Sequence, residues 1–539
     1  MAKIVKFKSK LSYYLDLLDS RQKIGDLWGV LDALKNAFAH SKTKIEKDGL
    51  WLLFGQTYFE MGQYQKSSDC FFRAVYITHL RAGAFFGIAR NLVCLKKFNL
   101  ALDYLEATLK WDFCDEYAQA VLDWTAHIKN NMNDVLFEHK NLIDTSKNLI
   151  LKQKFLDAQK ILQTLKSDEQ TLSLLSYCNF LNEDFSKAES LAKEVLNLDE
   201  NNFLALFVLY KIYGNLNTQK QQNILKQIVL GEYNDCSSLK SVATFLSQKQ
   251  MFYEALKFYE KLCKIDEFDA KNYLLCGLCL FKLKKIDDSL FYISKAMWLD
   301  SENPLYSFFY ELIKTNGLDD SIKIEAKLPK NIEREKVKIL LEIFFNGKFN
   351  EEIKKSYYLI RDIIWSYSLK DLSLTQNASN AICNSKNQKA LSVFNNLLLS
   401  NSLSKNQKFL MVKSALFSSN YYLISFVCDF SYSSFKLKKN EMQKFKNKNF
   451  REGVCDAVCY AECFYPKMML LKKIFKKAQE QQYSQFLKNM PHNVVACFLL
   501  KDFAEIFEKA CLFFETDKSF IKNLCKANSE VSGEQNFKE

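Results

Sequence analysis

Three cysteines near the C-terminus, Cys455, Cys459 and Cys463, follow one another at four-residue intervals. On an α-helix this spacing places the three thiols on one face, about 6 Å apart per step. Thiolates bind soft metals, and His492 is available as a fourth ligand. Small apolar residues on a buried stripe give the same pattern, however. We therefore predict no metal site, although the spacing alone does not decide whether these cysteines bind one.

A second cysteine pair, Cys276 and Cys279, forms the motif C-G-L-C. Such a pair is typical of redox sites and of one half of a zinc site. The sequence contains no second C-x-x-C, and no strand–helix–strand pattern surrounds this one. We interpret both thiols as helix-packing residues.

A lysine-rich stretch carries aromatic residues among its cations. Residues 431–480 contain 12 Lys and Arg against five Asp and Glu, in a chain whose formal net charge is +13. Phosphate contacts combined with aromatic stacking are typical of single-strand nucleic-acid binding. A solvated loop is the simpler interpretation, so nucleic acid is the secondary alternative. The candidate contacts are Lys436, Lys438, Lys439, Lys444, Lys446, Lys448 and Arg451.

The common catalytic motifs are absent from the sequence. No G-x-G-x-x-G or G-x-x-x-x-G-K is present to hold a dinucleotide or a phosphate, and no G-x-S-x-G to present a nucleophile. The five histidines are dispersed and form no H-E-x-x-H. We predict no catalytic residues and no cofactor, and hence a protein that is not an enzyme.

The composition indicates a helical chain. Only 14 glycines and 4 prolines occur in 539 residues, so the turns that β-sandwiches and barrels need are scarce. Apolar residues make up 48% of the chain, which excludes disorder for most of its length. We therefore predict an all-α fold.

Internal periodicity indicates how these helices are arranged. From Asp48 the chain reads DGLWLLFGQTYFEMGQYQKSSDCFFRAV, two apolar stripes at helical spacing around a turn at Gly62. Similar segments start near residues 169, 203, 236, 270 and 304, at intervals of 33 or 34 residues. Paired helices this short cannot bury both stripes alone, so neighbouring pairs must stack. Small residues such as Gly55 and Gly277 allow one helix backbone to approach the next, and we expect large ones such as Phe71 and Ile293 to fill the space between repeats.

These segments resemble the tetratricopeptide repeat, and the resemblance covers roughly residues 14–318. It implies an α–α superhelix, a solenoid, in which the first helix of each pair lines a concave groove for a peptide or protein. The residues that the resemblance places on this groove are Leu52, Gln56, Phe59, Phe86, Arg90, Val93, Trp124 and His127.

The groove positions depart from the carboxylate-clamp members of this family. Those members need lysine and asparagine where this chain has Leu52 and Gln56, and then Phe86 and Arg90. A mainly apolar groove with Arg90 as a polar anchor favours an amphipathic helix or an apolar peptide. The alternative is that aromatic residues of this set pack against the chain itself.

Beyond Gly317 the 34-residue pattern fades, but helical stripes continue. Residues 389–420 resemble a HEAT-type helix pair, and residues 435–451 are expected to form a loop or a frayed helix. We predict five segments along the chain. They are 1–135 and 136–318 with two runs of repeats, 319–432 with further helices, 433–525 with a basic helical region, and 526–539 as a disordered tail.

Two functions remain open from the sequence. The first is a protein-interaction scaffold that binds a partner in the groove, and the second is an RNA- or DNA-associated regulator that uses residues 431–480. Sixteen cysteines scattered through helical patterns, without a signal peptide, indicate reduced thiols. We expect a cytoplasmic protein without a transmembrane segment.

Overall fold

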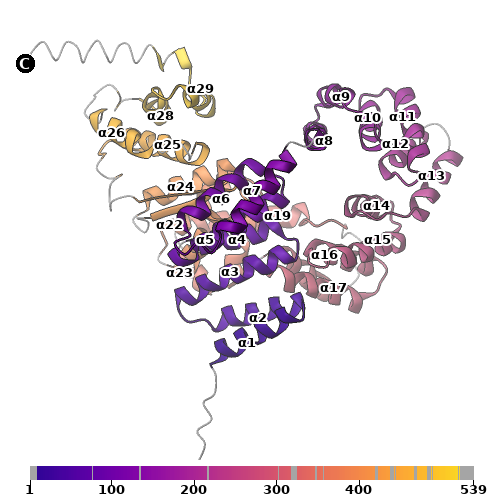
Figure 1. Cartoon of the computed structure of the whole chain (residues 1–539), viewed down its shortest axis with the longest axis horizontal. Coiled ribbons are helices and arrows are strands. Elements are labelled where there is room, and N and C mark those ends of the chain that lie inside the picture. Colours follow the sequence, from indigo (N-terminus) through magenta and orange to yellow (C-terminus); the bar gives the residue numbers. More distant parts are fainter. Residues whose placement is uncertain are drawn as a thin grey trace, which may run out of the picture. The chain divides into compact units, whose positions relative to one another are not determined.

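The fold is all-α, as the sequence predicts, apart from one two-stranded hairpin among the described residues (Figure 1). The computed structural model of the chain describes residues 9–75, 77–132, 135–214, 218–301, 303–316, 324–345, 349–355, 357–385, 387–418, 423–436, 442, 445–465, 470–481, 487, 490–519 and 521–522. The predicted tail at 526–539 lies outside the described residues.

The chain divides into two compact units. Unit 1 combines Met1–Val121 with Asn331–Glu539, and unit 2 is Leu122–Lys330. Unit 1 therefore contains both ends of the sequence, and its N-terminal and C-terminal parts pack on each other. Helix α7 (Ala118–Met132) crosses the boundary between the units.

The N-terminal part of unit 1 is a stack of antiparallel helix pairs. Each helix packs on the next along the chain, so that α2 contacts α3 and α4 contacts α5. The helices are α1 (Lys10–Lys23), α2 (Leu27–His40), α3 (Lys44–Glu60), α4 (Tyr64–Ala74), α5 (Arg81–Cys94) and α6 (Phe98–Trp111), with a short 3-10 helix at Thr78–Leu80.

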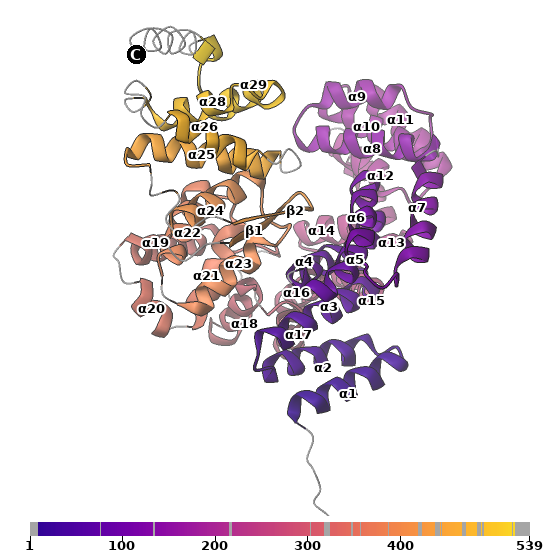
Figure 2. The same ribbon diagram turned by 60° about the vertical axis from the view of Figure 1, so that its left-hand side comes forward.

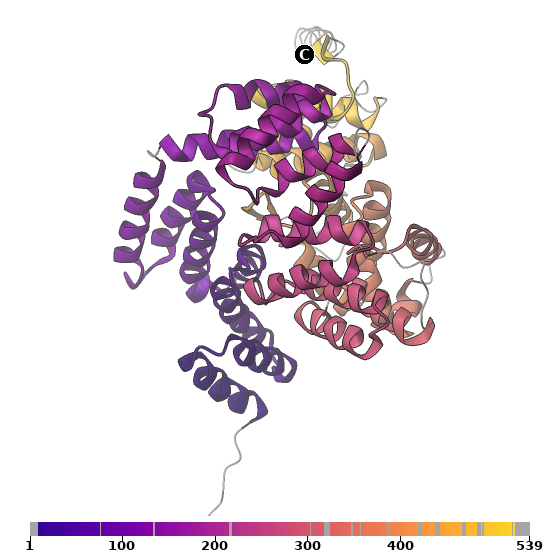
Figure 3. The same ribbon diagram turned by 90° about the vertical axis from the view of Figure 1, so that its right-hand side faces the viewer.

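Unit 2 repeats the same arrangement, and Figure 3 shows its helices lying side by side. The pairs are α8 (Val135–Leu151) with α9 (Phe155–Gln163), α10 (Glu169–Leu181) with α11 (Phe185–Leu198), α12 (Phe203–Tyr213) with α13 (Thr218–Leu230), α14 (Cys236–Gln248) with α15 (Phe252–Ile265) and α16 (Ala270–Lys282) with α17 (Ile286–Leu299), followed by α18 (Pro304–Asn316). We call the first member of each pair a first helix and the other a second helix.

The turns within the pairs share one backbone device. In these turns the second residue after the first helix adopts a left-handed backbone conformation. The amide of the residue that follows it donates to the carbonyl five residues earlier, as Lys97 does to Leu92 at 2.8 Å. This geometry ends a helix and satisfies its last carbonyls. Most of these positions are not glycine, which explains how so few glycines suffice. The residues are Gly25, Gly62, Lys96, Gln153, Glu183, Gln250 and Lys284, with φ from 58° to 72°.

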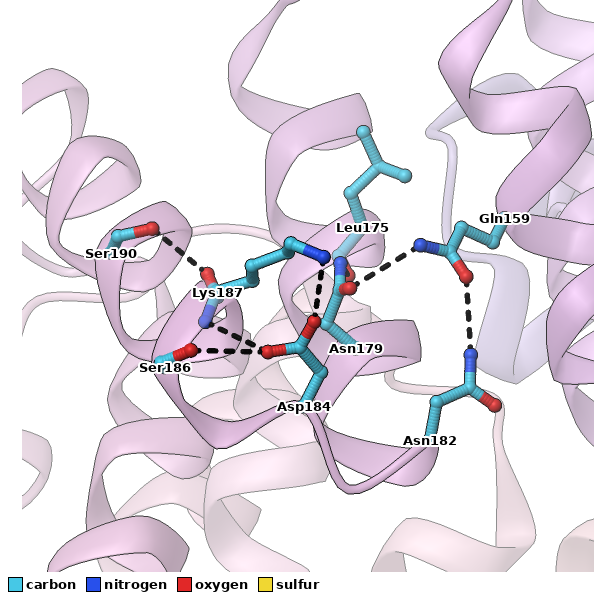
Figure 4. A network of polar contacts seen from close by, with 8 residues as sticks. All are labelled: Gln159, Leu175, Asn179, Asn182, Asp184, Ser186, Lys187 and Ser190. Atoms are coloured by element: carbon cyan, nitrogen blue, oxygen red, sulfur yellow. Dashed lines mark hydrogen bonds and ion pairs between the residues drawn. The ribbon is translucent and has the colours of Figure 1, made fainter.

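A network of hydrogen bonds connects two successive helix pairs of unit 2, at the contact of α9 with α10 (Figure 4). Gln159 of α9 donates to Asn179 of α10 and accepts from Asn182, both at 3.2 Å. Asp184 accepts from the Lys187 amide and so caps α11. The bonds of Gln159 therefore connect two successive helix pairs, and the bond of Asp184 satisfies a backbone amide in the first turn of α11.

Contact between neighbouring helices, within a pair and between pairs, depends on small residues opposite large ones. The Phe71 ring of α4 lies between Gly55 of α3 and Gly87 of α5, where an added Cβ would come within 2.6 Å and 2.4 Å of ring carbons. Ile293 of α17 covers Gly277 of α16 in the same way. In both repeats a serine of the second helix donates to the carbonyl of that glycine, Ser67 to Gly55 at 2.6 Å and Ser289 to Gly277 at 2.7 Å.

The C-terminal part of unit 1 begins with further helices. They are α19 (Lys330–Phe345), α20 (Phe349–Lys355), α21 (Tyr357–Ser368), α22 (Leu372–Cys383), α23 (Gln388–Leu398) and α24 (Lys405–Phe417). Helix α24 packs mainly on α22 rather than on α23, its expected partner in a HEAT-type pair. After the hairpin come α25 (Lys448–Phe464), α26 (Leu471–Gln481), α28 (His492–Leu500) and α29 (Ala504–Phe513).

The hairpin of β1 (Leu423–Cys428) and β2 (Ser431–Lys436) was not expected from the sequence. It spans the predicted boundary at residue 432 and includes the start of the expected loop at 435–451. Its two-residue turn, Asp429 and Phe430, has positive φ at both positions, the conformation that Asn-Gly or Gly-Gly usually signals. Neither residue is glycine, so the sequence carries no such signal. Figure 2 shows the hairpin beside α23 and α24.

The hairpin and the α23–α24 connection pack on the second helices of the N-terminal stack. Buried Tyr104 of α6 donates to the Phe430 carbonyl at 2.7 Å and accepts from the Tyr432 amide at 3.0 Å. Asp69 of α4 accepts from the Asn401 amide at 2.9 Å and from Ser400 Oγ at 2.7 Å. Burial raises the pKa of the Asp69 carboxyl, which these donors oppose. The C-terminal part therefore docks on α4 and α6.

Substitution of Gly55 tests the packing of α3 on α4. Gly55→Ala should lower the free energy of unfolding by about 1–3 kcal/mol, because the new Cβ overpacks the Phe71 ring. Gly49→Ala in the same helix meets no atom within 4 Å and should raise it by about 0.5–1 kcal/mol. Chemical denaturation of both variants measures the difference, and equal effects would contradict this packing.

Removal of the Tyr104 hydroxyl tests the docking of the hairpin. Tyr104→Phe should cost about 1–3 kcal/mol, because the Phe430 carbonyl and the Tyr432 amide lose their partner in a buried site. Tyr253→Phe, at a side chain that is 57% exposed, should change stability by no more than about 0.5 kcal/mol. Hydrogen exchange should also show faster exchange at the Tyr432 amide in Tyr104→Phe alone.

Candidate functional site

A cavity of about 210 Å³ opens on the first helices of unit 1. Its walls come from the last turns of α1 and α3 and from the middle of α5, and the Phe71 ring forms its floor. Polar side chains surround an aromatic base. The lining residues are Gln22, Gln56, Phe59, Glu60, Phe71, Gly87 and Arg90.

Arg90 is the cation of this cavity. Its guanidinium carbon lies 4.0 Å from the centre of the Phe59 ring, and the side chain is half-buried. Burial lowers the pKa of Arg90, while nearby Glu60 opposes this shift. An arginine stacked on a ring keeps its edge donors available for a ligand.

The structure brings three of the predicted groove residues together, because Gln56, Phe59 and Arg90 all line the cavity. Two others lie close to Gly83 or Tyr117. The Phe86 ring is 5.3 Å from that of Tyr117, and Leu52 reaches within 3.9 Å of where a Gly83 Cβ would lie.

The remaining groove residues do not join this cavity. Val93 is 9% exposed and packs in the interior of the stack. Trp124 and His127 lie on α7 within unit 2, with their rings 5.7 Å apart. Sequence reasoning missed Gln22, Glu60 and Tyr117. Only Glu60, which directly follows Phe59, had a signal that could have found it.

Two aromatic residues in the described part of the basic stretch are not available for stacking on bases. Phe445 and Phe450 are buried and pack on each other at 5.7 Å. Lys446 and Lys448 are exposed and Arg451 is half-buried, while the backbone of Lys436 belongs to β2. Lys438, Lys439 and Lys444 lie outside the described residues.

Cys455, Cys459 and Cys463 form a buried stripe on α25. The Cys455 and Cys459 sulfurs are 3.9 Å apart, and burial raises the pKa of both the Cys459 and Cys463 thiols. Protonated thiols are poor metal ligands. The structure also engages His492 elsewhere, and the described residues contain no group of three or more ligands that could hold a metal ion.

The C-G-L-C pair is likewise buried. Cys276 lies with its sulfur 3.6 Å from that of Cys263 on the preceding helix, and burial raises the pKa of Cys279 to about 12. Both thiols pack between α15 and α16.

A cluster of ionisable side chains connects α24, α25 and α28. The carboxylate of Asp456 on α25, 1% exposed, lies 2.5 Å from Lys413 Nζ of α24 and 2.7 Å from His492 Nδ1 of α28. The hydrogen bond to Asp456 raises the pKa of His492, and burial opposes this shift. Lys413, and His492 when it is protonated, compensate the charge of a buried carboxylate, so the cluster stabilises the packing of these helices.

A family model described as "Tetratricopeptide repeat" matches residues 49–78, which hold the Gly55–Phe71 contact and part of the cavity. No curated protein sequence matches the chain. None of the helices in the described part of the chain is long and apolar enough to cross a bilayer.

Solved structures of repeat proteins also match. The TPR2AB domain of yeast Sti1 in a complex with pHSP90 is 11% identical, covering 46% of this chain and 98% of its own, with a TM-score of 0.21. Yeast Tom70 is 14% identical over 88% of this chain and 97% of its own, with a TM-score of 0.20. The TPR domain of P58(IPK) is 14% identical over 56% and 88%, with a TM-score of 0.23. Residues 49–78 therefore match a tetratricopeptide repeat, and the described helices before and after them form stacked pairs.

The bond between His492 and Asp456 predicts a pH dependence. Because the folded-state pKa of His492 is raised above its ordinary value of about 6.5, its contribution to stability is fully present below that pH and is lost as the pH rises through the raised value. His492→Gln should therefore flatten the fall in melting temperature between pH 5.5 and pH 8.5. His79→Gln, at an exposed histidine, should keep the wild-type slope. Parallel curves for wild type and His492→Gln would contradict the role of this bond.

Proposed function

We propose that this chain is a tetratricopeptide repeat protein, as the match of residues 49–78 supports, and that it is a non-enzymatic scaffold that binds a peptide or protein partner on its first-helix face. The observation that carries this proposal is the cavity at Arg90, which opens on α1, α3 and α5. The docking of the hairpin on α4 and α6 supports it further, since that contact uses the opposite, second helices.

The size of the cavity favours a side chain of a partner over a metabolite. Small-molecule sites usually enclose roughly 300–1,000 Å³. At about 210 Å³, this cavity suits one anchoring side chain of a larger ligand. The rest of such a ligand would lie along the flanking first-helix surface, where Leu52 and Phe86 are half-buried.

The chemistry of the cavity favours an amphipathic or apolar peptide with a polar anchor. Phe59 and Phe71 provide an apolar floor, and Arg90 offers charged donors at the rim. A side chain of the peptide whose polar end accepts hydrogen bonds from Arg90, and whose apolar part covers the Phe59 and Phe71 rings, would use both the charge and the apolar surface of the cavity. Trp124 and His127 offer a separate pair of rings on unit 2.

We place the protein in the cytoplasm as part of the same proposal. Most of the described cysteines are buried, and some lie close together, such as Cys263 and Cys276 with sulfurs 3.6 Å apart. A reducing compartment keeps such neighbouring thiols from oxidation.

The proposal predicts that partner binding requires Arg90. A double variant, Phe86→Ala with Arg90→Ala, should weaken partner capture by about 30-fold, as expected for loss of a contact worth about 2 kcal/mol. Affinity capture with quantitative mass spectrometry, on the full-length chain, measures this loss.

Arg73→Ala provides the matched control. Arg73 also stacks on a ring of the same repeat, 4.5 Å from the centre of Trp51, but it belongs to the second helix α4. Capture should be unchanged in this variant. Partners retained equally by the double variant and the wild type would mean that the Arg90 cavity is not the binding site.

A further inference from the structure

The first helices of unit 2 carry a continuous row of aromatic rings that the proposed cavity does not include. Adjacent rings lie 5.1–6.5 Å apart from centre to centre and connect three successive first helices. We call this row the aromatic ladder. Its members are Tyr177 and Phe180 on α10, Phe203, Phe207 and Tyr210 on α12, and Phe245 on α14.

The ladder contains two buried rings and four half-buried rings. Tyr210 and Phe245 are 6% and 5% exposed, and they contact each other edge to face at 5.1 Å. Phe203 and Phe207 pack on Phe245 and remain half-buried, as do the two rings of α10. The half-buried rings therefore present apolar area to solvent from a rigid base, which is the property of an anchor surface in an interface.

Two lysines lie on the ladder without a carboxylate partner among the described residues. Lys211 Nζ is 5.4 Å from the centre of the Phe207 ring, and Lys249 Nζ is 5.0 Å from that of Tyr210. Both side chains are exposed.

These three helices carry two other charged side chains. Lys240 of α14 lies 3.8 Å from Asp269, which compensates its charge, whereas Glu169 at the start of α10 accepts from the neutral Asn202 amide at 2.6 Å and keeps its charge. The charged groups that lie over the rings of the ladder are Lys211 and Lys249, so the charge beside these rings is positive.

We propose that the aromatic ladder, with Lys211 and Lys249, is a docking surface for an acidic peptide segment that also carries apolar side chains. The apolar side chains of the peptide cover the half-buried rings, and its carboxylates pair with the two ammonium groups. This surface belongs to unit 2, whereas the Arg90 cavity belongs to unit 1, so it is a second site beyond the proposed one.

The geometry of the ladder favours a peptide over a single-stranded nucleic acid. Stacking of successive bases needs free ring faces and a row of cations along the backbone. Here the contacts of Phe245 with Phe203, Phe207 and Tyr210 are edge to face, and two lysines are too few to follow a phosphate chain.

Fluorescence anisotropy on the full-length chain tests this proposal with defined probes. The probes are a panel of labelled 12-residue peptides in which Asp and Glu alternate with Leu and Phe. Each has two companions, one with Lys in place of the acids and one with Ser in place of the apolar residues. A labelled 12-nucleotide oligouridine serves as the nucleic-acid probe.

Charge reversal on the ladder is compared with the same reversal on second helices. Lys211→Glu with Lys249→Glu removes the proposed contacts. Lys257→Glu with Lys295→Glu changes the net charge equally, and these lysines also lie over rings, 4.6 Å from Tyr253 and 4.7 Å from Phe291. They belong to the second helices α15 and α17, so they control for charge and for loss of a cation–ring contact.

The expected result is binding of acidic apolar peptides that weakens at least ten-fold in the Lys211/Lys249 variant and less than two-fold in the Lys257/Lys295 variant. The lysine and serine companions should bind at least ten-fold more weakly than their acidic parents. Binding by no acidic peptide of the panel, equal loss in both variants, or tighter binding of oligouridine would each overturn the proposal. Peptide binding that persists in the Lys211/Lys249 variant and is lost in Arg90→Ala would belong to the Arg90 cavity and would overturn the ladder proposal, so the failure of either site is told apart from that of the other.

Discussion

The close approach of neighbouring helix backbones is the contact on which the rest of this protein depends. A helix pair of this length cannot bury its own apolar stripes, so each pair is stable only when the next one covers it. The Phe71 ring meets two glycines, one in its own repeat and one in the next, and Ile293 covers Gly277 in the same manner far along the chain. A single Cβ at these points would separate the helices, and the stack would lose its spacing.

The same stacking creates two different faces in unit 1. The second helices α4 and α6 contact the α23–α24 connection through half-buried Asp69 and the β hairpin through buried Tyr104. The first helices α1, α3 and α5 carry the cavity at Arg90. The chain itself therefore covers part of the second-helix face, and the proposed ligand surface lies on the first helices.

The two candidate surfaces differ in their chemistry. In unit 1 a single arginine lies on Phe59 beside glutamines and Glu60, so the cavity offers a polar anchor on an aromatic floor. In unit 2 a row of rings carries Lys211 and Lys249, and the row extends across three helices. A scaffold with two such surfaces can hold different segments of its partners, because each surface selects a different pattern of charge and apolar area.

The helical fold, the repeat spacing and the pairing of Gly55 with Phe71 could be predicted from the sequence, because each depends on residues within one or two helical turns or one repeat. So could the membership of Gln56, Phe59 and Arg90 in one surface. The hairpin turn at Asp429 and Phe430 could not be predicted, since both residues adopt a left-handed backbone conformation without the glycine that usually indicates such a turn. Nor could the contribution of Gln22, the engagement of His492 by Asp456, or the docking on Tyr104. These contacts join residues that are distant in sequence, and only the folded chain decides which of them meet.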